Sequence, residues 1–309
     1  MADVGDRLPI ALFIDRTFAP DAFATALAGE VAVREEVSES ERGRVAALVT
    51  ASRPVGAAEV APYPQLRLVL TCSTGIDHLD LDELRRRALI AAHTPTYCSD
   101  EVADHALACV LGAWRGLWRL SDDTRAGGWD EGAMLRRFDA QRLGIVGLGR
   151  IGARLAHRAR ALGIDVVGHD PVAAPPEVPS IGLDELLATA DAVSVHVPGA
   201  PGTPPLLGAA EIATMKPGAA LVNVARASLV DLDAVVAALR SGALSAAAWD
   251  VWPQEPPAAG DPRLQTPGLL VTPHIAWSSP EADAAGIREG VEALRDVLVH
   301  GRPPATVVS

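Results

Sequence analysis

Short apolar runs rich in β-branched residues alternate along the chain with longer segments of helical periodicity. The runs lack a strict alternation of apolar and polar positions, which is typical of strands whose sheet is covered on both faces. They predict strands at 10–15, 45–50, 66–72, 143–149, 165–170, 192–198, 219–225, 245–251 and 269–274. Helices are predicted between them, for example at 150–162 and 231–241. Strands that alternate with helices indicate an α/β fold with parallel sheets.

The segment 99–141 divides the series of strands into two. A helical pattern begins near Ser99 or Asp100, and its apolar residues recur at helical spacing: Val102, Ala106, Val110, Ala113 and Leu117. The segment also holds three of the six tryptophans: Trp114, Trp118 and Trp129. Packing in a core and a projecting arm at a dimer interface explain these tryptophans about equally well, because aromatic residues concentrate at interfaces.

Length and charge narrow the class of protein. The chain has 309 residues, which suits about two domains of ordinary size. Its net charge of −12 argues against binding to nucleic acid or to an anionic membrane, since both need clustered positive charge. No apolar run approaches the roughly 20 residues that span a bilayer, and the N-terminus is acidic where a signal peptide is basic. We therefore expect a cytoplasmic protein.

Neither the cysteines nor the histidines suggest a disulfide or a metal site. The three cysteines, Cys72, Cys98 and Cys109, contain no CxxC pattern, so we expect buried, reduced thiols. The histidines show no spacing typical of metal ligands, and we expect no metal.

One glycine-rich turn has the sequence context of a dinucleotide-binding site. Gly147, Gly149 and Gly152 form a GxGxxG pattern after a predicted strand and before a predicted helix, and the next strand ends in Asp170. The first glycine permits the tight turn, the second lets the backbone approach a pyrophosphate, and the third lets the helix pack on the strand. The start of the helix offers free N–H groups and a positive dipole end to the phosphates. A carboxylate at Asp170 would bind the ribose hydroxyls and repel a 2′-phosphate, which favours NAD over NADP.

Three polar residues follow later strands of the same half of the chain. Arg226, Glu255 and His274 lie at or just past the ends of three successive predicted strands. Ligands of parallel α/β sheets bind beyond the carboxyl ends of the strands. An arginine, a carboxylate and a histidine beside a nicotinamide coenzyme suit hydride transfer to a carbonyl, because the protein must orient the substrate and handle one proton.

Five motifs along the chain form an ordered set: GLGRIG, HDP, VNVARASLVD, DVWPQEP and TPHIAW. Upstream of them lie the stretches STGIDHLD and YCSDEVADHAL. In order and approximate spacing the motifs resemble those of the D-isomer-specific 2-hydroxyacid dehydrogenases, and the upstream stretches are similar to that family's substrate loop and hinge helix. The hinge helix is most similar to the branch of glycerate and hydroxypyruvate reductases and C-terminal-binding-protein-like oxidoreductases.

The resemblance implies two doubly wound parallel-sheet (Rossmann-like) domains separated by a cleft. Residues 1–96 with 281–309 would form a flavodoxin-like substrate-binding domain, to which a C-terminal helix at about 281–300 crosses back. Residues 97–280 would form an NAD-binding Rossmann domain. The cleft would close over coenzyme and substrate and exclude water.

The resemblance also implies roles for the three polar residues. His274 matches the family's acid/base histidine, and Glu255 matches the glutamate that pairs with it. A carboxylate partner favours the imidazolium form, which keeps a proton available near neutral pH. Arg226 matches the arginine that grips the substrate's carboxylate and carbonyl oxygen, for which the guanidinium fork is well shaped.

Further residues are assigned to substrate and coenzyme binding. The backbone N–H groups of Ser73, Thr74 and Gly75 match the family's carboxylate-binding loop, although the family usually has Gly-Ala-Gly there. Arg53 is a second candidate cation for the substrate, with a solvated loop arginine as the alternative, and Trp277 either lines the pocket or simply packs. The coenzyme residues beyond the glycines and Asp170 are Val102, Arg150, Ile151, Val197, Pro198, Val224 and Asp250, the last of which matches a contact to the nicotinamide carboxamide.

These assignments predict an NADH-preferring enzyme that reduces a 2-oxo acid to a D-2-hydroxy acid. The alternative is an NAD(H)-responsive binding protein with little turnover, similar to the corepressor members of the superfamily, which keep the same three polar residues. A homodimer is expected through the segment 99–141 and the NAD-binding domain. One departure concerns pocket shape: Ala227 follows Arg226 where the family usually has glycine, which matters only if φ at this position is positive.

Overall fold

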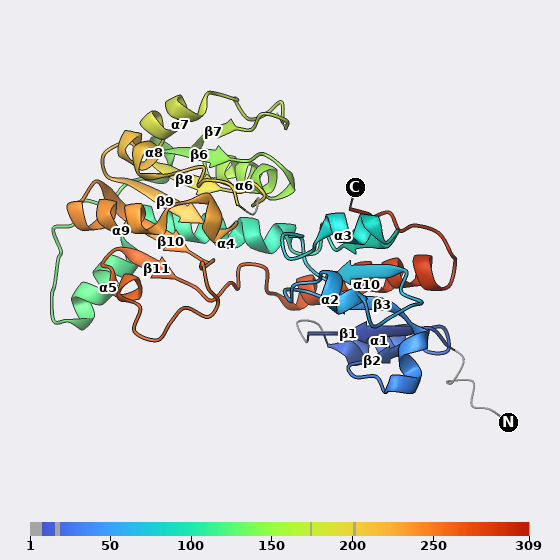
Figure 1. Ribbon diagram of the computed structural model, residues 1–309. Coiled ribbons are helices and arrows are strands. Elements are labelled where there is room, and N and C mark those ends of the chain that lie inside the picture. Colours follow the sequence, from blue (N-terminus) through green and yellow to red (C-terminus); the bar gives the residue numbers. More distant parts are fainter. Residues whose placement is uncertain (1–7, 16–18, 174, 200–201, 309) are drawn as a thin grey trace. The chain divides into compact units, whose positions relative to one another are not determined.

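The computed structural model describes the chain at residues 8–15, 19–173, 175–199 and 202–308. The chain divides into two compact units. The first comprises Met1–Cys98 with Ser278–Ser309, and the second comprises Ser99–Trp277. Each unit is an α/β layer structure around its own parallel sheet (Figure 1).

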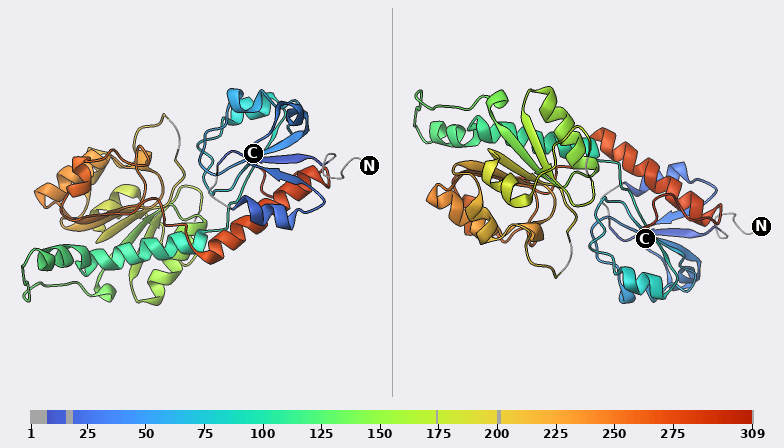
Figure 2. Two further views of the ribbon diagram at one scale, coloured as in Figure 1. Left: turned by 90° about the horizontal axis from the view of Figure 1, so that it is seen from below. Right: turned by 90° about the horizontal axis from the view of Figure 1, so that it is seen from above.

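The first unit contains a five-stranded sheet in the order β2-β1-β3-β4-β5, with all neighbouring strands parallel. Its strands are β1 (Ile10–Phe13), β2 (Ala32–Arg34), β3 (Val45–Thr50), β4 (Leu68–Thr71) and β5 (Ile90–His93). Its helices are α1 (Pro20–Ala26), α2 (Ala57–Val60), α3 (Leu81–Arg86) and α10 (Pro280–Leu298), with a 3₁₀ turn η2 (Glu39–Arg44). Helices α1 and α10 cover one face, and α3 lies on the other (Figure 2).

The second unit contains a six-stranded parallel sheet in the order β11-β10-β9-β8-β6-β7. Its strands are β6 (Arg142–Val146), β7 (Asp165–His169), β8 (Ala192–Val195), β9 (Ala219–Asn223), β10 (Leu244–Trp249) and β11 (Leu269–Val271). Its α-helices are α4 (Ser99–Trp114), α5 (Leu117–Arg125), α6 (Arg150–Ala161), α7 (Leu183–Thr189), α8 (Ala209–Thr214) and α9 (Leu232–Ser241). The 3₁₀ turns are η3 (Phe138–Ala140), η4 (Ala227–Leu229) and η5 (Pro262–Gln265). Helices α4 and α6 pack together on one face, and α7, α8 and α9 cover the other (Figures 1 and 2).

Burial on both faces explains why the strands are apolar without alternation. Every residue of β3, β4, β8 and β9 is buried. A strand in the middle of such a sheet has no face left for water, so both of its side-chain rows must be apolar or internally hydrogen-bonded. The prediction of an α/β fold with parallel sheets is confirmed.

All nine predicted strands are present, although several end earlier than predicted. Strand β11 stops at Val271, so His274 lies in the loop beyond it rather than at the strand's end. The prediction missed β2 and β5. Strand β2 has three residues and an exposed Arg34, and β5 has the sequence IAAH, in which alanine carries little strand signal.

The helical pattern of the middle segment was predicted to run through Leu117, and this is wrong. Helix α4 ends at Trp114 because Gly116 adopts a left-handed conformation with φ of 59°. Leu117 then begins α5 and is 61% exposed. Of the tryptophans, Trp114 belongs to the core, as the packing explanation predicts, and Trp129 is 75% exposed.

All three cysteines are buried, and their thiols are reduced, as predicted. Among the residues that the structure describes, none of the helices is long and apolar enough to cross a membrane.

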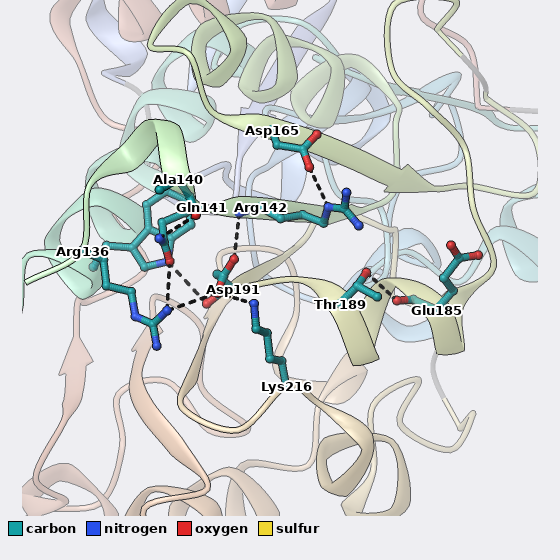
Figure 3. Close-up of polar contacts among 10 residues, drawn as sticks. Arg136, Ala140, Gln141, Arg142, Asp165, Glu185, Thr189, Asp191 and Lys216 are labelled. Atoms are coloured by element: carbon teal, nitrogen blue, oxygen red, sulfur yellow. Dashed lines mark hydrogen bonds and ion pairs between the residues drawn. The ribbon is translucent and has the colours of Figure 1, made fainter.

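A buried carboxylate ties together the amino ends of the strands in the second unit (Figure 3). Asp191 precedes β8 and is 8% exposed. Its Oδ2 accepts a hydrogen bond from the backbone N–H of Arg142 at 2.9 Å, and its Oδ1 accepts one from Lys216 Nζ at 2.8 Å. Arg136 Nη1 lies 3.5 Å from the same Oδ1. The only lysine of the chain thus neutralises a carboxylate that the sheet cannot leave unpaired.

Asp191→Ala should lower the free energy of unfolding by about 3 kcal/mol, because it leaves the N–H of Arg142 and the ammonium of Lys216 without their acceptor. Asp165→Ala is the matched control, since Asp165 pairs at 2.7 Å with the side chain of the same Arg142 but is 54% exposed. An exposed ion pair contributes only about 0–1 kcal/mol. Urea denaturation measures both values, and equal losses would contradict a special role for the buried carboxylate.

Candidate functional site

The glycine turn between β6 and α6 shows which glycines the fold itself requires. Gly147 has φ of 97°, a region that side chains with a Cβ rarely adopt, and a Cβ there would lie 2.7 Å from the carbonyl carbon of His196. A Cβ on Gly152 would lie 1.9 Å from the carbonyl oxygen of Gly147, so only glycine lets α6 pack on the turn. A Cβ on Gly149 would meet nothing within 4 Å. The fold leaves open space at Gly149, which a ligand approaching the backbone could use.

Helix α6 begins directly after this open position. Gly149 is its N-cap and makes no side-chain cap, so the first N–H groups of the helix have no side-chain acceptor at that residue. A depression of about 730 Å³ beside the start of the helix is lined by Asp100, Leu148, Gly149, Arg150, Ala153, Arg154, His157, Arg158 and Glu177. An uncapped helix start that faces open space is suited to binding a phosphate group.

Asp170 follows β7 and is held by the backbone on both sides of the turn. It accepts hydrogen bonds from the N–H groups of Leu148 at 2.8 Å, Val172 at 2.8 Å and Ala173 at 2.9 Å. Burial alone would raise the pKa of Asp170, but these three N–H groups together hold it below the usual value. A fixed, charged carboxylate therefore stands next to the glycine turn.

The predicted histidine and glutamate are in contact. His274 Nδ1 lies 2.7 Å from Glu255 Oε2, and Glu255 Oε1 accepts the backbone N–H of Trp252 at 2.9 Å. Burial tends to raise the pKa of Glu255, but the hydrogen bonds from His274 and Trp252 and the charge of Arg226 lower it further than burial raises it. Glu255 is thus kept ionised as a partner for the imidazole.

His274 occupies a strained backbone position in the loop after β11. Its φ is 52°, which is uncommon for a residue with a Cβ. Asp250 fixes this loop, because its Oδ1 accepts the Thr272 hydroxyl at 2.6 Å and the N–H of Ile275 at 2.9 Å. Its Oδ2 accepts the N–H of Ala276 at 3.0 Å.

Trp277, another predicted residue, contacts the same loop. Trp277 is half-buried, and its indole N–H donates to the carbonyl oxygen of His274 at 3.1 Å. The tryptophan therefore packs on the backbone of His274. Strain of the kind seen at His274 persists where surrounding contacts enforce it, commonly at functional sites.

Arg226 follows β9 and is oriented by its own loop. The amide of Asn223 donates to the carbonyl oxygen of Arg226 at 2.9 Å, and a Cβ on Gly199 would lie 2.9 Å from Arg226 Cγ. Gly199 therefore leaves the space that the aliphatic stem of Arg226 occupies. Ala227 is not among the described residues with positive φ, so the methyl group there causes no backbone strain.

The remaining predicted residues fall into two groups. In the second unit, Val102 and Val224 are buried at 7% and 8% exposure, and Val197 and Pro198 follow the end of β8. In the first unit, Ser73, Thr74 and Gly75 follow β4. Arg53 is an exposed loop residue whose Nη1 donates to the carbonyl oxygen of Ile14 at 3.4 Å.

Sequence reasoning missed several residues that hold these groups in place. It did not single out Gly199, Asn223 or Asp15, whose carboxylate accepts the N–H groups of Ala51, Ser52 and Arg53. The only available signal was their position at or soon after the end of a strand, which such residues share with ordinary loop residues.

Comparison with known proteins identifies the family. Residues 107–276 match the model of the D-isomer specific 2-hydroxyacid dehydrogenase, NAD binding domain. The chain belongs to this family. The family predicted from the motifs is therefore confirmed, and the second unit contains the family's NAD-binding domain.

Curated relatives cover nearly the whole chain. The D-3-phosphoglycerate dehydrogenase of Mycobacterium leprae is 35% identical over an alignment of 314 residues. The alignment covers 97% of this chain but 59% of that protein. The chain thus spans about three fifths of the length of this relative. The glycerate dehydrogenase of Methylorubrum extorquens is 32% identical over 285 residues, which cover 88% of each chain.

Solved structures share the fold. An NADPH-dependent glyoxylate/hydroxypyruvate reductase from Sinorhizobium meliloti, in complex with NADP and malonate, superimposes with a TM-score of 0.84 at 26% identity. The match covers 97% of each chain.

Substitution of two glycines separates the demands of the fold from those of the coenzyme. Gly149→Ala should melt at the wild-type temperature, because its methyl group enters open space, yet it should weaken NADH binding about tenfold or more by blocking close approach to the backbone. Gly152→Ala should lower the melting temperature itself, because its methyl group overlaps the carbonyl of Gly147. Thermal melts and NADH fluorescence titrations measure the two effects. A Gly149→Ala protein that binds NADH as tightly as the wild type would contradict this assignment.

Proposed function

We propose that this protein is an NAD-dependent oxidoreductase that reduces a 2-oxo acid to a D-2-hydroxy acid. The observation that carries the proposal is the 2.7 Å contact between His274 and Glu255 on a strained loop of the unit that contains the NAD-binding domain. The charge of Arg226 acts on the same glutamate. A proton donor and a cation for the substrate are the two functions that reduction of a 2-oxo acid requires from the protein.

His274 acts as the proton donor in this proposal. Its Nδ1 faces Glu255, so in the imidazolium form the Nδ1–H is donated to the carboxylate and the Nε2–H remains for the carbonyl oxygen of the substrate. In the reverse direction the neutral Nε2 accepts the proton of the hydroxyl group. Bound NADH supplies the hydride.

Arg226 and the loop at 73–75 bind the substrate's anionic groups. The guanidinium of Arg226 binds the carboxylate and polarises the carbonyl group, and Gly199 gives its stem the room to do so. The first unit contributes backbone N–H groups of the loop to the carboxylate. Small 2-oxo acids such as glyoxylate and hydroxypyruvate form the substrate class, in line with the names of the relatives that the chain resembles.

NADH is the preferred coenzyme in this proposal. Three backbone N–H groups hold Asp170 ionised beside the glycine turn, where a carboxylate suits ribose hydroxyls and repels a 2′-phosphate. Asp250 contributes a second contact, since its Oδ2 accepts only one hydrogen bond within the described chain and has a lone pair left for the nicotinamide carboxamide.

The competing proposal is an NAD(H)-responsive binding protein with little turnover. Binding proteins of this kind would keep the same arginine, glutamate and histidine. The geometry of these residues therefore favours neither the enzyme nor the binding protein. The coverage of 88% of a glycerate dehydrogenase favours the enzyme. NADH oxidation at 340 nm with a panel of 2-oxo acids, and NADPH in parallel, decides between them. Tight NADH binding without turnover on any acid would reject the enzyme, and equal rates with NADPH would reject the preference for NADH.

His274→Asn should lower kcat about 10²- to 10⁴-fold while the Kd for NADH stays unchanged, because the general acid is lost. Asparagine is the sharpest replacement, since it tolerates the left-handed backbone of His274 and its Nδ2 can still donate to Glu255. His300→Asn, at an exposed position, is the control. Steady-state kinetics and NADH fluorescence measure both variants. Wild-type kcat in His274→Asn would remove this residue from the mechanism.

We also propose a homodimer that uses the segment 99–141. Three large apolar side chains are exposed on or near α5: Leu117 at 61%, Trp129 at 75% and Met134 at 95%. Sedimentation equilibrium should give twice the mass of one chain, and Leu117→Ser with Met134→Ser should weaken the association. Val299→Ser, at a side chain that is 43% exposed in the other unit, is the control. A monomeric wild-type protein would reject this interface.

A further inference from the structure

The loop after β4 holds its carbonyl groups and leaves its N–H groups open. The carbonyl oxygen of Ser73 accepts the N–H of Thr94 at 3.2 Å, and that of Thr74 accepts His93 Nδ1 at 3.1 Å. The carbonyl oxygen of Gly75 accepts the hydroxyl of Ser73 at 2.7 Å. Three consecutive peptide units are thus anchored through their oxygens.

The N–H groups of the same peptide units belong to Thr74, Gly75 and Ile76. Within the described part of the chain, none of the three donates a hydrogen bond. In a trans peptide the N–H points away from the C=O, so each N–H is turned away from the group that anchors its own peptide unit. These three residues are half-buried, where successive open N–H groups form a concave site for an anion.

The short hydrogen bonds of the hydroxyls of Thr71 and Ser73 fit one direction, in which the Thr71 proton goes to Ser73 at 2.7 Å rather than to the carbonyl oxygen of Ala51 at 3.5 Å. Ser73 donates its only hydroxyl proton to Gly75, so the 2.7 Å contact between Ser73 Oγ and Thr71 Oγ1 needs the proton of Thr71. Thr71 is fully buried and must then accept from His78 Nε2, at 2.9 Å. The chain of donors runs from His78 through Thr71 and Ser73 to the carbonyl of Gly75.

We propose that His93 and Thr71 are positioning residues that shape an anion receptor from the N–H groups of Thr74, Gly75 and Ile76. The inference rests on the proposed function for the identity of the anion, which is the carboxylate of a 2-oxo acid. His93 fixes the peptide unit between Thr74 and Gly75 directly, and Thr71 fixes the next unit through Ser73. Neither side chain needs to touch the substrate, because His93 acts on the carbonyl oxygen of Thr74 and Thr71 acts through Ser73 on that of Gly75.

Paired substitutions test the hydrogen bonds rather than the bulk of these side chains. His93→Leu and Thr71→Val remove the donors and should each raise the KM for the 2-oxo acid about tenfold, with kcat and the KM for NADH within about twofold of wild type. His93→Asn places an amide nitrogen where Nδ1 lies and Thr71→Ser keeps the hydroxyl, so both should restore a KM close to wild type. His300→Leu, at an exposed position, is the control. Wild-type KM in both His93→Leu and Thr71→Val, or equal loss in Leu and Asn variants, would overturn the proposal.

A binding measurement makes the test independent of turnover and of the folding of any one variant. Amide resonances of Thr74, Gly75 and Ile76 in the ¹⁵N-labelled protein should shift saturably with oxamate, a carboxylate that the enzyme does not reduce as it reduces a 2-oxo acid. The shifts should persist in His93→Asn. In His93→Leu the affinity for oxamate, measured from the same shifts, should fall about tenfold. Turnover without any movement of these amides in the wild type would reject the receptor and leave the proposed function standing. Saturable shifts without turnover on any 2-oxo acid would support the receptor and reject the proposed function.

Discussion

The buried carboxylate of Asp250 holds the part of the chain on which the proposed chemistry depends. It is 1% exposed at the end of β10 and binds Thr272 on one side of His274 and Ile275 and Ala276 on the other. A left-handed residue with a Cβ costs about 1–2 kcal/mol. A hydrogen bond to a charged group contributes about 1.5–3 kcal/mol, so the clamp outweighs the strain that it imposes. The sheet thus holds the histidine against Glu255 in a conformation that the loop alone would not adopt.

The fold could be predicted from the sequence as far as burial determines it. Strands such as β3 and β9 are buried along their whole length, so their apolar runs left a clear signal. Strand β5 left almost none, because its IAAH sequence owes its extended form to pairing with β4 rather than to its own preference. The end of α4 depends on the left-handed Gly116, and a helical pattern that continues to Leu117 conceals that break.

Candidate residues could be proposed from the sequence where several residue types occur together in a defined context. Glycines in a strand-turn-helix context, and an arginine, a glutamate and a histidine at strand ends, are of this kind, and His274 and Glu255 are indeed in contact. Residues that act through another group were missed. Gly199 matters only because a Cβ would meet Arg226, and His93 only because its ring reaches the carbonyl of Thr74. Such roles arise from contacts between distant segments, which spacing along the chain does not reveal.

The two units use the backbone in the same way. In the second unit, Asp170 accepts the N–H groups of Leu148 and Val172, while the N-cap Gly149 offers no side-chain acceptor to the first N–H groups of α6. In the first unit, His93 and Thr94 hold carbonyl groups so that N–H groups are left open. Backbone donors bind any phosphate or carboxylate of suitable size, so they provide affinity for the anionic groups that all substrates of one class share. Discrimination between substrates then falls to side chains near the reacting carbon, which is why motifs built on glycines and strand ends indicate the reaction class more sharply than the particular acid.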